Sequence, residues 1–149
     1  MEFSHALDPF VNFESAVNRA VAQGVSGATA MYLATCGKDL RPSVRTVLYK
    51  GIVRGGVAIY TNYNSTKALD LAENENAALL FHWESLAQQV RFEGSVQKLT
   101  RAESEAYFAT RPRLAQLGAW ACDAPPSAPC TCSSVNNWDH VNHRSSVNN

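Results

Sequence analysis

The sequence predicts a mainly β fold with short helices, an α+β chain built around an antiparallel sheet or barrel. Five runs have the apolar or alternating pattern of strands, and turn residues separate them. The second and third runs have no helix between them, and the glycine fingerprint of a dinucleotide fold is missing, which disfavours a Rossmann arrangement. The five runs are residues 28–36, 43–50, 57–61, 77–83 and 88–99.

Three helices are expected between and around these strands. Helical spacing of apolar residues predicts the first over residues 9–23, where a glycine follows as a natural end. The second is expected to begin at Ser65, whose hydroxyl suits a capping position. Thr100 and Glu103 have capping-box spacing, which predicts a third helix that ends before Pro112.

Composition limits the classes of function. The 149 residues fit one domain, with 46% hydrophobic residues, 17% charged residues and a formal net charge of zero. This balance gives no broad electrostatic surface for nucleic acid or for an acidic membrane. The chain has no apolar run long enough to span a membrane and no basic leader before an apolar stretch, so we expect a cytoplasmic protein with neither partner.

The domain organisation is expected to change near residue 121. Residues 1–121 are predicted to form the globular domain, and residues 122–149 an irregular, disordered tail rich in Pro, Ser and Asn. The change is abrupt, as though another reading frame began there. The tail has Cys130, Cys132 and His pairs, but their spacing differs from that of structural zinc sites, so no metal is predicted.

The run SVRTVLYKG, residues 43–51, carries two cations in a strand that should be half buried. Alternation puts Arg45 and Lys50 on opposite faces, although the long Lys50 stem at the strand end could reach round the edge. Spacing alone favours solvent-exposed charges on an ordinary strand for both residues, with an anion site as the alternative. The face of Arg45 also holds Val47 and Tyr49, and the other face holds Val44, Thr46 and Leu48.

The run YTNYNSTK, residues 60–67, ends a strand and begins a helix. A helix N-terminus has free N–H groups and a positive dipole end, so it suits a phosphate. Lys67 in the first turn opposes that dipole unless an anion lies between them, and Thr61, Ser65 and Thr66 offer hydroxyl donors. A capped surface helix with an exposed lysine is the alternative.

Two further positions suit a ligand. Tyr107 and Arg111 are four residues apart and share a helical face, where a guanidinium and a phenol could grip a phosphate. A cation at a helix C-terminus is also favourable by itself, so a purely structural role stays open. Gln89, on the polar face of its strand opposite Val90, is either solvated or a partner for a heterocycle.

Four segments in this order, RTVLYKG, YTNYNSTKA, LLFHWESLAQQVRFEG and YFATRPRLAQLGAW, closely resemble the pyridoxamine/pyridoxine 5′-phosphate oxidases. The resemblance covers roughly residues 8–121. It implies an FMN-binding split β-barrel, a homodimer, and oxidation of pyridoxamine 5′-phosphate or pyridoxine 5′-phosphate to pyridoxal 5′-phosphate with O2 as acceptor. It does not identify a catalytic acid or base.

The resemblance also implies roles for individual residues. Arg45 would contact the flavin phosphate, and Lys50, Tyr107 and Arg111 would hold the phosphate of the B6 vitamer. The implied FMN-binding residues are Arg45, Thr46, Val47, Leu48, Tyr49, Lys50, Tyr60, Thr61, Thr66, Lys67 and Gln89.

Three departures from the family pattern qualify these roles. Thr66 stands where the family commonly has arginine, and Ala115 where a serine usually joins the substrate site. The familiar pattern stops at Trp120, so we expect weak FMN binding and low turnover. A related flavoprotein, such as a phenazine-type oxidase or a flavin reductase, and a non-catalytic flavin-binding protein are the alternatives.

Overall fold

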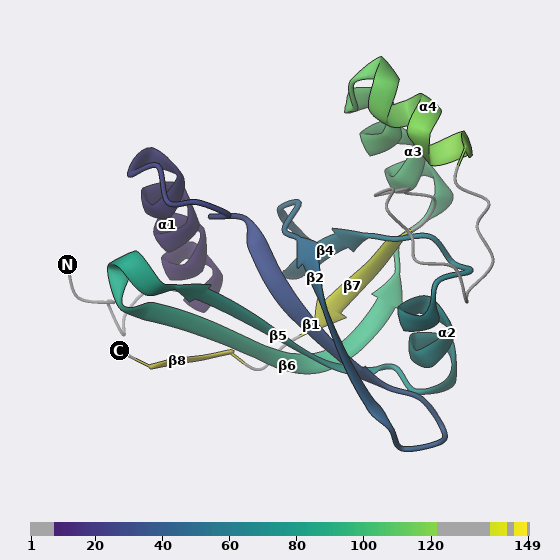
Figure 1. Ribbon diagram of the computed structural model, residues 1–149, viewed down its shortest axis with the longest axis horizontal. Helices are drawn as coiled ribbons and strands as arrows, with labels where there is room; N and C mark the ends of the chain where they lie inside the picture. Colours follow the sequence, from purple (N-terminus) through teal and green to yellow (C-terminus); the bar gives the residue numbers. More distant parts are fainter. Residues whose placement is uncertain (1–7, 122–137, 143–144, 149) are drawn as a thin grey trace.

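The computed structural model describes residues 8–121, 138–142 and 145–148 (Figure 1). Its strands form one eight-stranded antiparallel sheet in the order β2-β1-β5-β6-β7-β4-β3, with β8 paired to β6. The predicted mainly β class with short helices is therefore confirmed.

The strands are β1 (Ala30–Cys36), β2 (Pro42–Leu48), β3 (Ile52–Val53), β4 (Gly56–Tyr60), β5 (Asn76–Trp83), β6 (Gln88–Lys98), β7 (Trp138–Asn142) and β8 (Ser145–Asn148). The helices are α1 (Pro9–Ala22), α2 (Thr66–Glu73), α3 (Arg101–Thr110) and α4 (Arg113–Ala121), with a 3-10 turn η1 (Glu84–Leu86).

All five predicted strands and all three predicted helices are present. The segment expected to be only a hairpin connection contains β3, and α4 follows Pro112 where sequence reasoning assigned no helix. β7 and β8 lie within the expected tail, and β7 pairs with both β4 and β6. The residues between α4 and β7, including Cys130 and Cys132, lie outside the described residues.

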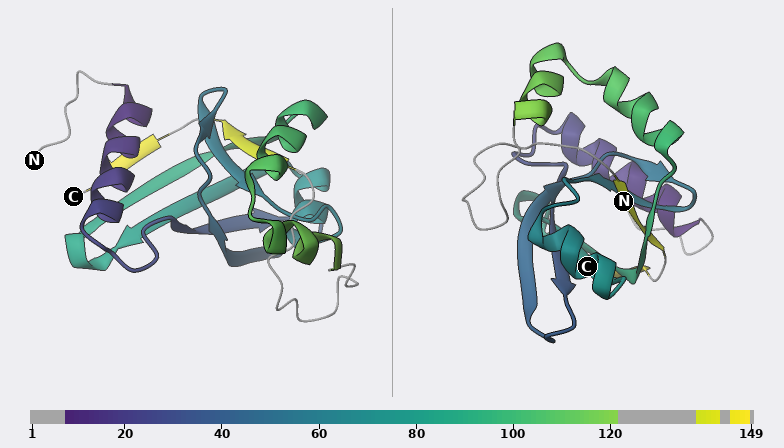
Figure 2. Two further views of the ribbon diagram at one scale, coloured as in Figure 1. Left: turned by 90° about the horizontal axis from the view of Figure 1, so that it is seen from above. Right: turned by 90° about the vertical axis from the view of Figure 1, so that its right-hand side faces the viewer.

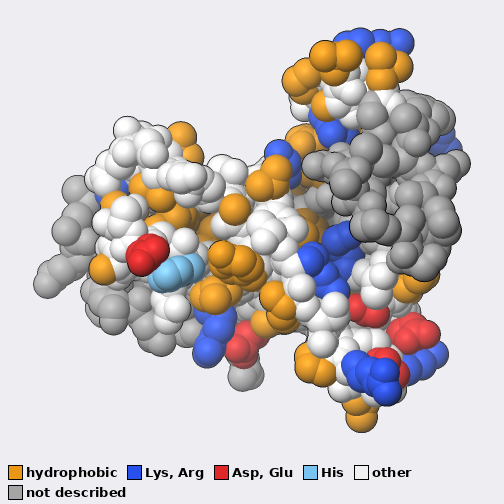
Figure 3. All heavy atoms as spheres, in the orientation of Figure 1, with side chains coloured by type: hydrophobic (Ala, Val, Ile, Leu, Met, Phe, Trp, Pro, Cys, Tyr) orange, Lys and Arg blue, Asp and Glu red, His pale blue; other side chains and the backbone are white. Residues whose placement is uncertain are grey.

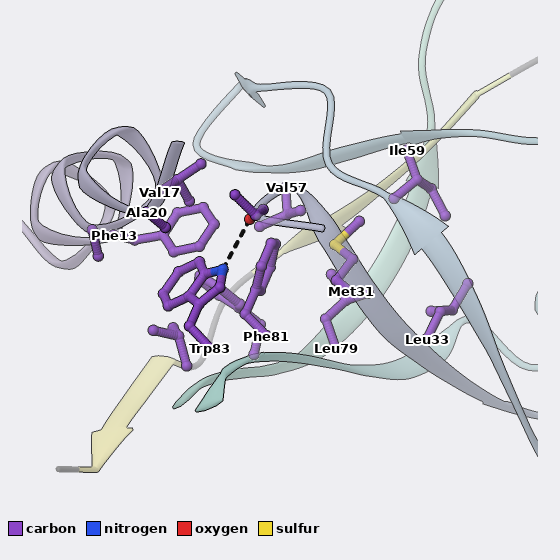
Figure 4. Close-up of a cluster of buried hydrophobic side chains, with 14 of the residues drawn as sticks. Phe13, Val17, Ala20, Met31, Leu33, Val57, Ile59, Leu79, Phe81 and Trp83 are labelled. Carbon is purple, nitrogen blue, oxygen red and sulfur yellow. Dashed lines mark hydrogen bonds between the residues drawn. The ribbon is translucent and has the colours of Figure 1, made fainter. Parts of the chain in front are cut away.

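The core lies between α1 and the concave face of the sheet (Figure 4). Phe13 of α1 packs edge-to-face against Phe81 and Phe92, each with ring centroids 4.9 Å from its own. Trp83 is buried beside them, and its indole N–H donates to the Ala28 carbonyl at 2.9 Å, which satisfies the one polar atom of that ring. This aromatic contact fixes α1 against β5 and β6.

The chain changes its sheet partner at Gly51. The Tyr49 N–H still donates to the Thr29 carbonyl, beside β1, at 2.8 Å, whereas the Lys50 N–H donates to the Ala58 carbonyl of β4 at 3.1 Å. The bend requires a φ of +111° at Gly51, a backbone conformation that residues with a side chain rarely adopt. The end of β2 is thereby joined to β4, which curves the sheet toward a barrel, and Lys50 lies at the joint.

Figure 2 shows α1 at one end of the sheet, with α2, α3 and α4 near the other end. Within the part of the chain that the structure describes, no helix is long and apolar enough to cross a membrane.

Side-chain bonds attach α2 to the hairpin of β1 and β2. Thr35 donates its hydroxyl to Asp70 Oδ2 at 2.6 Å, and Arg45 Nη1 donates to the Thr35 hydroxyl at 2.7 Å. Arg45 Nη2 donates to the Ser43 hydroxyl at 2.7 Å and lies 3.6 Å from Asp70 Oδ2. We call Thr35, Ser43, Arg45 and Asp70 the Arg45 network.

Replacing Asp70 tests how much this network stabilises the fold. Asp70→Ala should lower the free energy of unfolding by about 1–3 kcal/mol, because it leaves the buried Thr35 hydroxyl without its acceptor and the half-buried Arg45 without its carboxylate partner. Chemical denaturation of wild type and variant measures this loss.

Glu105→Ala is the matched control, because it removes an exposed carboxylate from an ion pair within α3. Its effect should stay within about 0.5 kcal/mol. Equal unfolding midpoints for the two variants would contradict a stabilising role for the network.

Candidate functional site

The first part of the site lies where β4 leads into α2. The Thr61 side chain is buried, and its hydroxyl lies 3.2 Å from the Ser65 hydroxyl. Ser65 occupies the predicted N-cap position, but its side chain makes no capping bond to the helix. The predicted N-cap position of Ser65 is therefore correct. The expected hydrogen bond from the helix backbone to its hydroxyl is absent, because the hydroxyl lies beside that of Thr61. Lys67 follows in the first turn and is half buried, whereas Thr66 is exposed.

Arg45 approaches the same helix from β2 through the Arg45 network. Asp70 and Lys67 are three residues apart on α2 and so are neighbours on the helix surface. The Arg45 guanidinium, which lies beside Asp70, and the Lys67 ammonium are therefore both near α2. Burial lowers the pKa of Arg45, and the nearby Asp70 opposes that shift. Arg45 therefore faces the interior and a carboxylate, not bulk water, and the alternative of a solvated surface charge is excluded for it.

The second part of the site joins β4 to α3. The rings of Tyr60 and Tyr107 stack with centroids 3.7 Å apart and an interplanar angle of 20°. Burial raises the pKa of both phenols, that of Tyr60 further because of Tyr107, and Arg111 partly opposes the shift at Tyr107. Both phenols consequently stay neutral and keep a proton to donate.

Two cations lie beside this stack. Partial burial lowers the pKa of Lys50, and the positive charge of Arg111 lowers it further. Arg111 Nη1 is buried and has no hydrogen-bond partner among the described residues. A buried guanidinium nitrogen without an acceptor, next to a second cation, favours an anionic ligand. We call Lys50, Tyr60, Tyr107 and Arg111 the cation–tyrosine cluster.

The end of α3 holds Arg111 in place. Arg111 is the C-cap of the helix, and Gln116 of α4 donates its amide to the carbonyls of Phe108 at 3.2 Å and Arg111 at 2.9 Å. These bonds fix the corner between α3 and α4, so the backbone of Arg111 is positioned before any ligand binds. In the space-filling view, Lys and Arg side chains gather between the sheet and these helices (Figure 3).

The two parts of the site meet at the end of β4. Tyr60 belongs to the cation–tyrosine cluster, and Thr61, the next residue, contacts Ser65 before α2. Two regions suited to anions thus lie on either side of one strand end. Among the residues singled out from the sequence, the structure stacks Tyr60 on Tyr107, places the Thr61 hydroxyl beside that of Ser65, and brings Arg111 near enough to Lys50 to lower its pKa.

Other predicted residues lie on the opposite face of the sheet. Exposure alternates along β2 as predicted, with Thr46 and Leu48 exposed and Arg45 and Val47 half buried. Gln89 is exposed on β6, opposite His82 of β5. The structure therefore does not bring Gln89, Thr46 or Leu48 to the concave face beside Arg45.

Three groups of residues that support the site were not found from the sequence: the partners of Arg45, the amide of Gln116, and the Arg54 partner of Glu103. The pairing of Thr35 with Ser43 across the hairpin is a signal that could have found these two partners of Arg45, but not Asp70 of α2. Among the described residues, no group of three or more His, Cys, Asp or Glu could hold a metal.

Comparison with known proteins places these features in a family. The sequence profile of the family described as pyridoxamine 5′-phosphate oxidase matches residues 17–134. The pyridoxine/pyridoxamine 5′-phosphate oxidase of Paracidovorax citrulli is 52% identical over 120 residues, which are 80% of this chain and 53% of the relative. A chloroplastic enzyme of the same name from Arabidopsis thaliana is 50% identical over 112 residues, 75% of this chain and 21% of the relative.

Solved structures show the same fold. PhzG from Burkholderia lata, in complex with tetrahydrophenazine-1-carboxylic acid, has a TM-score of 0.78 and 22% identity, with 87% of this chain and 66% of that chain covered. A pyridoxamine 5′-phosphate oxidase-related, FMN binding protein from Nostoc punctiforme has a TM-score of 0.68 and 19% identity, with 92% and 80% covered. These likenesses confirm the predicted antiparallel split barrel.

The chain spans about half the length of the bacterial relatives that it matches, 53% of the Paracidovorax citrulli enzyme and 56% of one from Bradyrhizobium diazoefficiens. The family profile nevertheless covers most of the chain, and the relatives are about half identical to it. The chain therefore belongs to the pyridoxamine 5′-phosphate oxidase family.

Proposed function

We propose that this chain binds FMN and takes part in the oxidation of pyridoxamine 5′-phosphate or pyridoxine 5′-phosphate to pyridoxal 5′-phosphate, with dioxygen as acceptor. The observation that carries the proposal is the cation–tyrosine cluster, in which a buried nitrogen of Arg111 lacks an acceptor beside Lys50. Membership in the family supports the same assignment. A cytoplasmic location remains a prediction.

The cluster suits the phosphate of the substrate. Arg111 offers a planar guanidinium whose fork matches phosphate oxygens, and Lys50 adds a second positive charge. Tyr107 stays protonated because burial raises its pKa, so its phenol donates a hydrogen bond to a phosphate oxygen. These three residues bind and orient the substrate by a group that does not react, which leaves its pyridine end free to face the flavin.

The residues around α2 suit the phosphate of FMN. Lys67, the hydroxyls of Thr61 and Thr66, and the first turn of the helix supply positive charge and donors, while Arg45 adds charge from β2. FMN held by these residues would supply the redox chemistry, as acceptor of a hydride equivalent from the C4′ carbon of the vitamer and donor of electrons to dioxygen. Because Tyr60 and Thr61 are consecutive, the two phosphates would lie on either side of the same strand end.

We also propose that two copies of the chain form the site. The outer face of β1 and β2 carries exposed apolar residues, with Val44 at 65% and Leu48 at 48% of full exposure, and β2 is an edge strand of the described sheet. Such a face is typical of a protein interface. Gln89 lies on this outer side, so a second copy would bring it to a flavin held between the subunits.

The phenazine-type alternative is supported by the likeness to PhzG, which concerns the fold alone. The cation–tyrosine cluster favours the phosphorylated vitamer, because a phenazine carboxylic acid brings one charge where the cluster offers two cations and two phenols. Flavin reduction without a B6 vitamer, and flavin binding without turnover, are the other outcomes that an assay must separate.

The first test is whether the purified protein binds and reduces FMN. Titration should show a flavin spectrum, and pyridoxine 5′-phosphate in air should produce hydrogen peroxide. Lys67→Ala should weaken FMN binding about 10- to 100-fold, because it removes a charged contact to phosphate.

Lys38→Ala replaces an exposed lysine of the β1–β2 turn and should leave FMN affinity unchanged. Failure to bind FMN would contradict the proposal. Flavin that binds but is not reduced by the vitamer would support the non-catalytic alternative.

The second test is the pH dependence of substrate binding. The pKa of Lys50 lies below the ordinary 10.5, because partial burial and Arg111 disfavour its charged form. The charged ammonium is the form of Lys50 that binds phosphate. As pH rises, affinity for pyridoxine 5′-phosphate should therefore begin to fall at a lower pH than it would with a lysine of ordinary pKa. Between the lowered pKa of folded Lys50 and the ordinary pKa of the unfolded chain, the unfolded state binds more protons than the folded state. The free energy of unfolding of the unliganded protein should therefore increase as pH rises through this range.

Lys50→Arg should remove this fall, because arginine stays charged throughout that range. Calorimetric titration with pyridoxine 5′-phosphate at several pH values measures this pH dependence of the affinity. Lys38→Arg is the control. A Lys50→Arg profile identical to that of wild type would exclude Lys50 from the phosphate site.

The third test concerns the second copy. Leu48→Asp should convert a dimer to monomers, because it places a charge on the proposed apolar interface. Leu69→Asp on α2 is the matched control, since both leucines are 48% exposed. Sedimentation velocity distinguishes the two states, and a dimer that survives Leu48→Asp and breaks with Leu69→Asp would place the interface elsewhere.

A further inference from the structure

We propose that Arg54 and Glu103 form a latch that positions the cation–tyrosine cluster, holding the β3–β4 hairpin against α3. The inference rests on the proposed function, since it assumes that the cluster binds the substrate phosphate. Neither residue lies in that cluster. Both are positioning residues, and they would act through the four side chains that face the ligand.

The cluster is assembled from two separate elements. Lys50 and Tyr60 lie immediately before and at the end of the β3–β4 hairpin, whereas Tyr107 and Arg111 lie on α3 and at its C-cap. These elements are far apart in the sequence, so the distance between the Lys50 ammonium and the Arg111 guanidinium depends on how the hairpin docks on the helix.

The charges of the cluster oppose this docking. Lys50 and Arg111 are both cations, and the positive charge of Arg111 helps to lower the pKa of Lys50. Like charges repel, so placing these two side chains in one cluster works against docking of the hairpin on α3. Attractive contacts between the two elements must offset it.

Two contacts between the hairpin and α3 meet this need. One is the stack of Tyr60 on Tyr107. The other is a two-point ion pair, in which Arg54 Nε donates to Glu103 Oε1 at 2.9 Å and Arg54 Nη2 donates to Glu103 Oε2 at 2.8 Å. The ion pair joins the tip of the hairpin to the first turn of the helix.

Both partners are held in place by local structure. Glu103 Oε2 accepts bonds from the Thr100 N–H at 2.8 Å and the Thr100 hydroxyl at 2.6 Å, which completes the capping box of α3. These bonds, with Arg54, lower the pKa of Glu103, so the carboxylate stays ionised. Arg54 has a φ of +52°, in the left-handed region, which sets the direction of its side chain.

An exposed ion pair commonly contributes little to the stability of a protein. The effect expected of Arg54 and Glu103 therefore comes from which two elements they join, and not from the strength of their ion pair. Arg101 and Glu105 form a comparable pair at 2.7 Å, but both belong to α3. Because that pair lies within a single helix, it does not hold the hairpin against α3 and should have no effect on the cluster. It therefore provides a matched control on the same helix.

The experiment compares Arg54→Asn with Arg101→Ala in the full chain. Asparagine tolerates the left-handed backbone of position 54, so this variant removes the guanidinium without straining the turn. Calorimetric titrations with pyridoxine 5′-phosphate and with pyridoxine, which lacks the phosphate, report the cluster and the rest of the site separately. Arg54→Asn should weaken the phosphorylated ligand about 3- to 10-fold and leave pyridoxine binding unchanged. Arg101→Ala should change neither.

The outcomes separate this inference from the proposed function. A wild-type protein with no preference for the phosphorylated ligand would overturn the phosphate site itself, and the latch with it. A wild-type preference that Arg54→Asn retains in full would overturn the latch alone. Equal weakening of both ligands would indicate general loosening and would also overturn the positioning role.

Glu103→Gln provides a second variant, because its amide oxygen still accepts bonds from Thr100. It should show the same selective loss, and the double variant should lose no more than either single variant, since the two residues act as one pair. Losses that add in the double variant would contradict a shared contact.

Discussion

The constraint on which the site depends is the placement of two positive side chains from different elements within one cluster. Lys50 and Arg111 belong to different elements, and the fold must hold these elements together against their repulsion. It does so with the stack of Tyr60 on Tyr107 within the cluster and with the Arg54–Glu103 ion pair outside it. The positive charge is thus left for a ligand, and binding relieves a cost that the folded chain already carries.

The sheet makes this arrangement possible at one position. Because Gly51 allows the chain to leave β1 and join β4, Lys50 lies at a joint and not within a regular strand. Simple alternation predicted that Lys50 and Arg45 occupy opposite faces, and the bend explains how both can serve sites at the end of β4. A glycine with a positive φ therefore contributes to the placement of a cation one residue away.

Much of this fold could be predicted because its signals are local. Alternation in β6 and the capping box at Thr100 depend on near neighbours in the sequence, and both are confirmed. The contact of Asp70 with Arg45 could not be predicted, because it depends on how α2 docks on a hairpin. The missed α4 and the turn of the Ser65 hydroxyl toward Thr61 involve particular side-chain contacts between residues eight and four positions apart, which a hydrophobic pattern does not reveal.

The two regions of positive charge differ in how far their charge is already balanced. Arg45 lies 3.6 Å from the Asp70 carboxylate and donates to two hydroxyls, so an incoming phosphate would compete with partners that are in place. Arg111 has a buried nitrogen with no acceptor among the described residues, and its neighbour Lys50 is a cation. Attraction for an anion should therefore be stronger at the cation–tyrosine cluster, while Arg45 mainly sets the position of α2 and of Lys67 on it. If the proposed sites are correct, a flavin phosphate would depend on α2 for its positive charge, and a substrate phosphate would depend on the docking of the hairpin against α3.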